Sequence, residues 1–209
     1  ALIALIQTDI KRILTYSSFS HVGLMVAGIF ASAMMVMRGT FTIQGAEGAL
    51  VQSFAHGINI VGLFYCADIL YKRFKTRDIR QMGGLAKVAP KFAILFMIIL
   101  FGAMGVPLTN GFVGEFISLK SIFDFNVLAA ILSGITIILA AAYLLRMYGK
   151  TMFNEGDQTL LASVSDLSDA EFSVLASLAV FVIAFGIFPQ PLIEMVQSPL
   201  NFIYQSMLS

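Results

Sequence analysis

The 209-residue sequence has a single cysteine, no tryptophan and few charged residues. Cys66 cannot form an internal disulfide, and its position in an apolar run predicts a small buried side chain rather than a reactive thiol. Charged residues make up 12% of the chain, and the formal net charge is +1. Such a chain has no basic field to attract phosphates, which argues against nucleic acid as a partner.

Motifs for a bound metal, nucleotide or haem are also missing. No His, Cys, Asp or Glu cluster has the spacing of a metal site, and no glycine-rich loop follows a strand to bind phosphate. A membrane haem would need paired axial histidines, and the spacing of His21 and His56 gives no indication of one. We therefore expect no cofactor and no metal in this chain.

The sequence is instead rich in apolar residues, which form 58% of it and give a mean hydropathy of +0.89. A soluble domain has about 45–50% apolar residues. A bilayer core needs about 20 consecutive apolar residues, and five stretches meet this requirement. They follow an apolar N-terminal stub that lacks an initiating Met and signal-peptide features, and that we interpret as the end of an earlier helix. The predicted segments are Ala1–Ile6, Ile13–Met37, Gly48–Tyr71, Val88–Phe123, Val127–Met147 and Ala170–Val196.

These segments predict an all-α fold, a polytopic transmembrane helix bundle that forms a single domain over residues 1–209. The segment Val88–Phe123 is too long for one straight crossing, and Pro107 with its neighbouring glycines predicts a break in mid-membrane. Thr109 and Asn110 are suited to cap the second half. Broken membrane helices often mark transport pathways, because protein or water must satisfy the freed backbone groups.

Other residues predict where helices begin and end. Pro90 suits the first turn of the broken helix, and Ser168 with Glu171 forms a capping-box pattern at the start of the last one. The sequence Phe-Pro-Gln-Pro at 188–191 predicts a termination. The polar segment Asn154–Ser168 is expected to be a solvated connection.

The lysines and arginines predict the orientation in the membrane. Eleven of the 13 fall on one side of the predicted helix arrangement, which places that side in the cytoplasm. Only Arg38 and Lys120 fall on the opposite side. The eleven are Lys11, Arg12, Lys72, Arg73, Lys75, Arg77, Arg80, Lys87, Lys91, Arg146 and Lys150.

Three titratable side chains remain well inside apolar segments: His21, His56 and Glu115. A charge at the centre of a membrane helix costs at least about 2.5–3.5 kcal/mol, so such groups usually face a polar interior and have a function. Imidazole changes its charge near neutral pH, and an intramembrane carboxyl can hold a proton. We interpret the three residues as proton-relay stations. A purely structural, hydrogen-bonded role is the alternative, above all for the histidines.

Several other polar residues are candidates for supporting roles or have simpler explanations. Ser17, Thr109 and Asn110 could order connecting water. Asp9 and Lys11 could be only a helix cap and a topogenic charge. Asp68 and Lys72, four residues apart, are best explained as an interfacial ion pair. Two glycine pairs, Gly23 with Gly28 and Gly57 with Gly62, suggest close helix packing.

Four stretches carry a specific resemblance to a known family. They are QTDIKRILTYSSFSHVG at 7–23, AHG at 55–57, TRDIRQMGGL at 76–85 and GVPLTNGFVGEF at 105–116. Together they resemble the antiporter-like subunits of proton-pumping NADH:quinone oxidoreductase, respiratory complex I, of the subunit M (chain 4) type. Sister subunits L and N and the large subunits of multisubunit sodium/proton antiporters are related to that type.

The resemblance implies a fold of about fourteen transmembrane helices with two inverted repeats, of which this chain would be the C-terminal part, namely the second repeat and a final helix. It implies that Glu115 is the acid of the broken helix and that His21 and His56 are the two membrane histidines. Asp9, Lys11 and Arg146 are candidate supporting residues. The Glu at 115, where the sister subunits usually carry Lys, favours the subunit M type.

The function implied is proton translocation coupled to NADH:quinone electron transfer, without redox or catalytic chemistry in this chain. NAD, FMN, iron–sulfur clusters and quinone are expected in other subunits. The expected partners are neighbouring complex I membrane subunits, especially sister antiporter-like subunits, with lipids and protons, in the bacterial inner membrane. A subunit of a multisubunit sodium/proton antiporter and a passive membrane scaffold are the alternatives.

Overall fold

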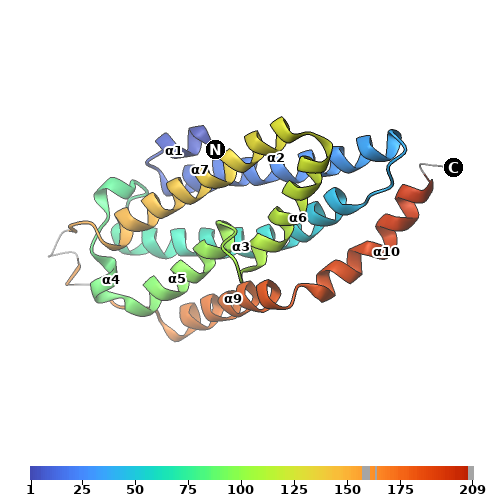
Figure 1. Ribbon diagram of the computed structural model, residues 1–209. Helices are drawn as coiled ribbons and strands as arrows, with labels where there is room; N and C mark the ends of the chain where they lie inside the picture. Colours follow the sequence, from blue (N-terminus) through green and yellow to red (C-terminus); the bar gives the residue numbers. More distant parts are fainter. Residues whose placement is uncertain (157–160, 163, 207–209) are drawn as a thin grey trace.

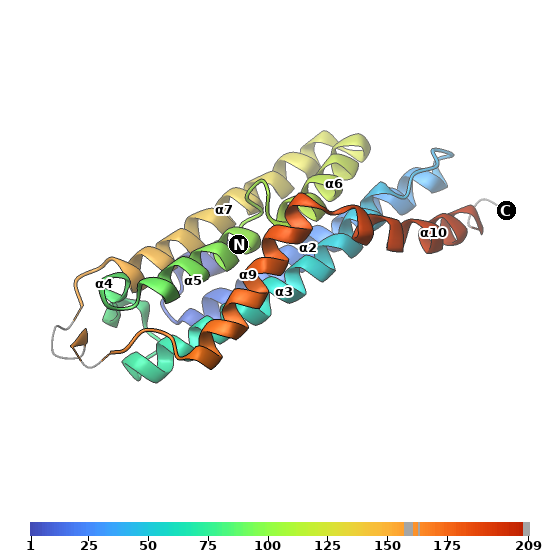
Figure 2. The same cartoon turned by 90° about the horizontal axis from the view of Figure 1, so that it is seen from below.

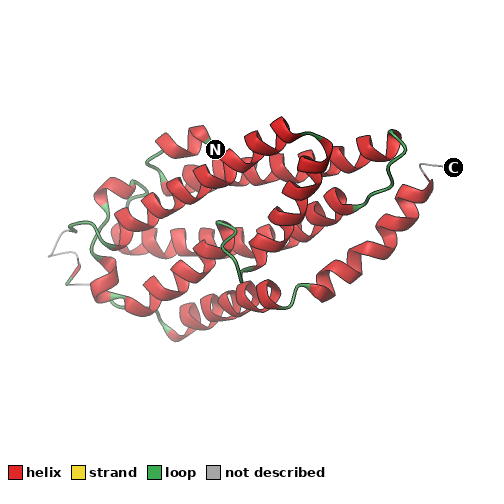
Figure 3. Cartoon of the chain, viewed as in Figure 1, coloured by secondary structure: helices red, strands yellow, loops and turns green. Residues whose placement is uncertain are grey.

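The computed structural model describes residues 1–156, 161–162 and 164–206, and these residues form a bundle of long helices without a strand (Figures 1 and 3). Within this part of the chain, four helices are long and apolar enough to cross a membrane: α2 (Ile10–Met37), α3 (Gln44–Phe74), α7 (Val127–Met152) and α9 (Asp169–Ile187). The predicted all-α, polytopic fold is confirmed. Large apolar side chains on the outside of the bundle, such as Phe19 and Ile138, are at least two-thirds exposed, as a lipid-facing surface requires.

The N-terminal stub is a short helix, α1 (Leu2–Ile6), and the next helices extend slightly beyond their predicted bounds. α2 begins at Ile10 because the Asp9 carboxylate accepts hydrogen bonds from the backbone nitrogens of Lys11 and Arg12. The link before α2 pairs with the segment after α3, since Ile10 N donates to Arg77 O and Ile79 N donates to Thr8 O. A 3₁₀ turn, η1 (Ile79–Gln81), and the short α4 (Leu85–Val88) complete this end of the bundle.

The predicted broken helix is present as α5 (Pro90–Ala103) and α6 (Asn110–Phe125). Pro90 lies in the first turn of α5, as predicted. Between the halves, Gly105 and Leu108 adopt positive φ angles of 64° and 71°. Thr109 is the N-cap residue of α6, but its hydroxyl donates to the carbonyl oxygens of Val106 and Phe101 instead of capping α6. The Thr109 hydroxyl therefore satisfies carbonyl groups at the end of the first half instead of backbone N–H groups at the start of α6.

The last predicted segment, Ala170–Val196, is not a single helix, whereas the termination predicted at 188–191 is confirmed. α9 ends at Ile187, and α10 (Gln190–Ser206) continues towards the α2–α3 loop (Figures 1 and 2). Pro189 has no N–H and restricts the residue before it, which explains the interruption. The Ser168–Glu171 capping box at the start of α9 is confirmed. The last turn of α9 lies on the break of α5–α6, because Gly186 contacts the Leu108 carbonyl.

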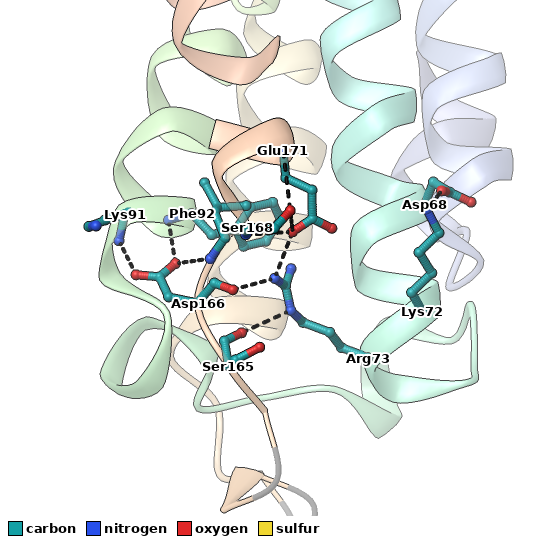
Figure 4. Close-up of polar contacts among 10 residues, drawn as sticks. Asp68, Lys72, Arg73, Lys91, Phe92, Ser165, Asp166, Ser168 and Glu171 are labelled. Atoms are coloured by element: carbon teal, nitrogen blue, oxygen red, sulfur yellow. Dashed lines mark hydrogen bonds and ion pairs between the residues drawn. The ribbon is translucent and has the colours of Figure 1, made fainter. Parts of the chain in front are cut away.

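We call the end of the bundle where α2 and α5 begin and where α3 and α7 end the basic end. Here Arg73 of α3 donates to the carbonyl oxygens of Ser165 and Asp166 at 3.2 and 3.0 Å and pairs with Glu171 at 3.4 Å (Figure 4). The Asp166 carboxylate accepts hydrogen bonds from the first backbone nitrogens of α5, those of Lys91 and Phe92.

The connection Asn154–Ser168 was expected to be solvated, and its described part is instead partly packed. Leu161 is buried, and Asp166 caps α5, which has no side-chain cap of its own. Residues 157–160 and 163 of this segment lie outside the described part of the chain. The predicted Asp68–Lys72 ion pair is confirmed at 2.9 Å and is largely exposed. A structured segment thus joins α3, α5 and α9 at the basic end.

Glycines let α2, α3 and α6 approach closely at the centre of the bundle. In membranes, helices associate through packing and hydrogen bonds, and small residues permit backbone contact. Gly28 contacts Gly45, and a Cβ at Gly48 would lie 2.6 Å from the backbone nitrogen of Ser118. Of the predicted packing glycines, Gly28 and Gly62 have close neighbours. The prediction is wrong within the described part of the chain for the other two, Gly23 and Gly57, where an added Cβ would meet no neighbouring atom within 4 Å.

Candidate functional site

Glu115 and His21 form a buried contact at the centre of the bundle. Glu115 lies on α6 shortly after the helix break and is 3% exposed, and His21 lies on α2 and is 5% exposed. The Nδ1 atom of His21 is 3.0 Å from Oε1 of Glu115. The contact is an ion pair when the imidazole is protonated and a hydrogen bond when it is neutral with its proton on Nδ1.

His56 completes a cluster of three titratable groups. It lies on α3, is partly buried, and its ring centroid is 5.3 Å from that of His21 at an interplanar angle of 40°. The three side chains come from three different helices and are separated by up to 94 positions in the sequence. The structure therefore brings the three predicted relay residues together.

The two oxygens of the Glu115 carboxyl have different surroundings. Oε1 faces His21 and also accepts a hydrogen bond of 3.0 Å from Nε2 of Gln52 on α3. Oε2 is buried and has no hydrogen-bond partner among the described residues. It lies against Gly105, where any Cβ would collide with it. The positive φ of Gly105 and the space that the carboxyl needs both favour glycine at this position.

The same asymmetry is found at His21. Its Nδ1 contacts the carboxyl, whereas its Nε2 is buried without a partner in the described part of the chain. A neutral imidazole can accept a proton on one nitrogen while it gives up the proton on the other. Among the described residues, the unpartnered Nε2 of His21 and Oε2 of Glu115 thus lie at the two ends of the contacting pair. Buried polar atoms of this kind are usually satisfied by ordered water or are kept for a function.

Some of the predicted supporting residues lie close to His21, His56 and Glu115. Ser17 is one helical turn before His21 and accepts a hydrogen bond of 2.8 Å from the hydroxyl of Tyr143 on α7. Asn110, at the start of α6, donates to the carbonyl of Ala55, the residue before His56, at 3.4 Å. Ser17 and Asn110 therefore connect α7 and the helix break to the histidine-bearing helices.

Other predicted supporting residues lie elsewhere. Asp9 and Lys11 are at the basic end, where Asp9 caps α2. Arg146 of α7 donates to the carbonyl of Gln7, which also lies at that end. Thr109 closes the end of α5 through its hydroxyl. The structure does not bring these four side chains into contact with the Glu115–His21 pair.

Sequence reasoning missed Gln52 and Tyr143. Gln52 is four residues before His56 and so lies one turn away on the same face of α3, and this spacing is a signal that could have identified it. Tyr143 has no local signal, because its partner Ser17 is 126 residues away and only the packing of α7 on α2 joins them. Gly105 is recognised as part of the site only once the helices are in place.

The described residues contain no group of three or more His, Cys, Asp or Glu that could hold a metal ion. Cys66 is a free, fully buried thiol, as predicted. The site therefore has a carboxyl, two imidazoles, amides and hydroxyls as its chemical groups. These groups are suited to proton transfer.

Comparison with known proteins identifies related sequences and structures. Residues 1–140 match the family described as NADH:quinone oxidoreductase/Mrp antiporter, TM. The chain is 37% identical over 194 residues to the NADH-quinone oxidoreductase subunit M of Rickettsia typhi, an alignment that covers 93% of this chain and 37% of that protein. The chain thus spans little more than a third of the length of the curated relatives that it matches.

Solved structures show the same arrangement of helices. A chain in respiratory complex I from Thermus thermophilus with bound NADH is 31% identical, with a TM-score of 0.84 over 99% of this chain and 41% of that one. A chain in the Mrp complex from Dietzia sp. DQ12-45-1b is 18% identical, with a TM-score of 0.80 over 99% of this chain and 46% of that one. At this identity, the second similarity is one of fold alone.

Proposed function

Because the chain belongs to the NADH:quinone oxidoreductase/Mrp antiporter transmembrane family, we propose that it is the C-terminal part of a proton-translocating subunit of respiratory complex I, of the subunit M type. The observation that carries this proposal is the buried contact of 3.0 Å between His21 and Glu115 beside a broken helix. A buried acid and base in contact can exchange a proton without any other reactant. The sequence identity to subunit M supports the choice of the complex I type.

The proposed transfer runs from His56 through His21 to Glu115. A proton that reaches His56 is passed to the free Nε2 of His21, across a ring separation that one water molecule can bridge. His21 then gives the proton on its Nδ1 to Glu115. Gln52 holds Oε1 in position throughout, and Gly105 leaves room for the second oxygen. The net result is one proton moved across the interface of α2, α3 and α6, with no bond broken other than those to hydrogen.

In this proposal the chain is one of several antiporter-like membrane subunits in a bacterial inner membrane. Neighbouring subunits hold the redox cofactors and the rest of the proton path, and they drive the transfer electrostatically. A charge change within a few ångströms of Glu115 acts strongly because the medium around the carboxyl has a low dielectric constant. The chain itself carries out no redox step.

A second candidate is a subunit of a multisubunit sodium/proton antiporter, which the family description, NADH:quinone oxidoreductase/Mrp antiporter, supports. The two candidates differ in what purifies with the full-length protein and in what drives transport. Redox subunits in the same complex, and proton movement that starts with NADH, support the first. Sodium-dependent proton movement without redox subunits would support the second.

The experiment that tests the proposal uses the full-length subunit that contains this chain, assembled in membrane vesicles, with Glu115→Gln. The substitution keeps the size of the side chain and an acceptor for Gln52 but cannot carry a proton. We expect NADH-driven proton pumping and quinone reduction to fall together, while assembly stays normal. Glu194→Gln, on the exposed face of α10, is the control. Normal pumping by an assembled Glu115→Gln complex would contradict the proposal and favour the scaffold alternative.

A further inference from the structure

An apolar groove lies on the outside of the bundle between α5 and α7, which run side by side from the basic end (Figure 2). Its volume is about 380 Å³. Tyr148 of α7 is buried and donates a hydrogen bond of 3.0 Å to the carbonyl of Ala93 on α5, so the hydroxyl of the one polar side chain in the groove is already engaged. The groove is lined by Ala86, Pro90, Ala93, Ile94, Met97, Ile98, Tyr148 and Phe153.

The groove extends from the basic end into the apolar part of the bundle. Its lining residues on α5 run from Pro90, in the first turn of the helix, to Ile98. Eight residues of α-helix rise about 12 Å. Ile94, between them, is 62% exposed and faces outwards. A groove of this length and apolar lining fits part of a lipid acyl chain.

Phe153 lies where the groove meets the basic end. It follows α7 and is 69% exposed, and its ring packs edge-on against that of Tyr148, with the centroids 5.7 Å apart. Aromatic side chains are enriched where a membrane meets water. Phe153 also lines a second hollow of about 340 Å³, together with Arg146, Gly149, Lys150 and Asn154. An apolar groove and a basic hollow therefore adjoin at one side chain.

The positive charge of this second hollow is not balanced by an acid. Lys150 is exposed, and within the described residues neither Lys150 nor Arg146 has an acidic partner within 4 Å. Arg146 donates through Nη2 to the carbonyl of Gln7, and its buried Nε has no partner in the described part of the chain. An added Cβ at Gly149 would meet no described atom within 4 Å beyond its own helix backbone and chain neighbours. The hollow thus combines two cations with space for an anionic group.

Other basic residues at this end are paired with acids or lie beside one. A third hollow at Phe153 contains Lys87 but also Glu155, and these opposite charges offset each other. Acidic partners within 4 Å are present for Lys72, Arg73 and Arg80. Arg146 and Lys150 are therefore the cations that give the mouth of the groove its net positive charge.

We propose that α5 and α7 bind one anionic phospholipid at the basic end, with an acyl chain in the groove and the phosphate between Arg146 and Lys150. Charge complementarity favours this occupant, because guanidinium and ammonium groups are common ligands of phosphate and basic pockets between membrane helices bind acidic head groups. Such a lipid joins the start of the broken helix to the end of α7. The inference does not depend on proton transfer.

The test uses the full-length subunit in its assembled complex, in vesicles of phosphatidylcholine. The probe is a small amount of phosphatidylglycerol with a photoactivatable group in its acyl chain, and the same probe with a choline head group is the reference. Mass spectrometry locates the adducts. We expect the phosphatidylglycerol probe to label the α5 peptide that contains Ile94 and Met97 more than the reference does. Both probes should label α9 equally at the exposed Val180.

Two variants remove different parts of the site. Lys150→Gln removes an exposed charge and should reduce phosphatidylglycerol labelling of α5 about fivefold, as for one basic residue at a membrane surface. Gly149→Leu fills the hollow, keeps both charges and should also reduce the labelling. The matched controls are Lys72→Gln, a paired lysine at the same end, and Gly134→Leu, where an added Cβ on α7 also meets no neighbouring atom among the described residues. Neither control should change the labelling.

Three results would overturn the inference. Equal labelling of α5 by the two probes would show an ordinary lipid contact without head-group selection. Phosphatidylglycerol labelling that survives Lys150→Gln and Gly149→Leu would show that the basic hollow does not bind the head group. Adducts on α9 but none on α5 with either probe would show that a neighbouring protein covers the groove instead.

Discussion

Gly114 offers a sharp test of how closely the site is assembled, because it immediately precedes Glu115 and lies against the backbone of α3. A Cβ added at Gly114 would lie 2.5 Å from the backbone nitrogen of Gln52 and 2.6 Å from its Cα. Carbon atoms pack at about 3.5–4.0 Å, so Gly114→Ala requires α3 and α6 to separate by about 1 Å. Backbone atoms cannot rotate away from such a contact, as the end of a flexible side chain can.

A separation of this size would lengthen the Gln52–Glu115 hydrogen bond from 3.0 Å to about 4 Å, which is beyond hydrogen-bonding distance. Overpacking of a well-packed site costs about 1–3 kcal/mol. A misplacement of about 1 Å in a reacting group can lower a rate about 100-fold. We therefore expect the Gly114→Ala complex to pump protons at a rate at least about tenfold lower and to unfold at a lower temperature.

The assay measures NADH-driven proton movement and quinone reduction in vesicles that carry the full-length subunit, with thermal unfolding of the purified complex. Gly23→Ala is the matched control, since Gly23 lies two residues after His21 and, among the described residues, an added Cβ would meet no atom within 4 Å beyond its own helix backbone and chain neighbours. The control should pump and unfold like the unmodified complex. Normal pumping and stability in Gly114→Ala would refute the close contact of α3 and α6 on which the site depends.

Three further predictions concern other parts of the structure. Gly105→Ala places a methyl group where Oε2 of Glu115 lies and should stop pumping. Gly39→Ala has a similar positive φ of 84°, but its added Cβ would meet no described atom within 4 Å, and it should leave pumping intact. Tyr143→Phe removes one buried hydrogen bond to Ser17 and should lower the free energy of unfolding by about 0.5–1.5 kcal/mol in thermal unfolding. An unchanged melting temperature would count against that bond. Asp166→Ala removes the cap of α5 and should lower the free energy of unfolding by about 1–2 kcal/mol in the same assay. Asp169→Ala, at an exposed position nearby, is the control and should lower it much less; equal losses of stability would contradict the capping role.

The fold was largely predictable from the sequence because the bilayer imposes a strong length requirement on apolar segments. The break near Pro107 was also predictable, because proline cannot continue the hydrogen-bond pattern of a helix. The continuation of the last segment as α10 was missed. α10 is less apolar than the membrane helices, and its burial depends on contacts with α2 and α3 that no local pattern reveals.

The titratable members of the site could be predicted, but most of their partners could not. His21, His56 and Glu115 are conspicuous as rare ionisable residues in apolar segments. Their distances depend on which faces of α2, α3 and α6 meet, and these faces are set by glycine contacts between residues far apart in the sequence. Glu47 was passed over because the predicted segment begins only at Gly48, whereas in the structure α3 begins at Gln44 and Gln197 of α10 donates to the Glu47 carboxyl.

The central claim is that His21 and Glu115 act in series in one proton transfer, and a double-mutant comparison tests it most directly. His21→Gln, Glu115→Gln and the double variant are introduced into the full-length subunit, and NADH-driven pumping is measured in assembled complexes. If the two residues act in series, each single variant lowers pumping to the same residual rate, and the double variant lowers it no further. Losses that multiply in the double variant, or normal pumping in either single variant, would contradict the claim.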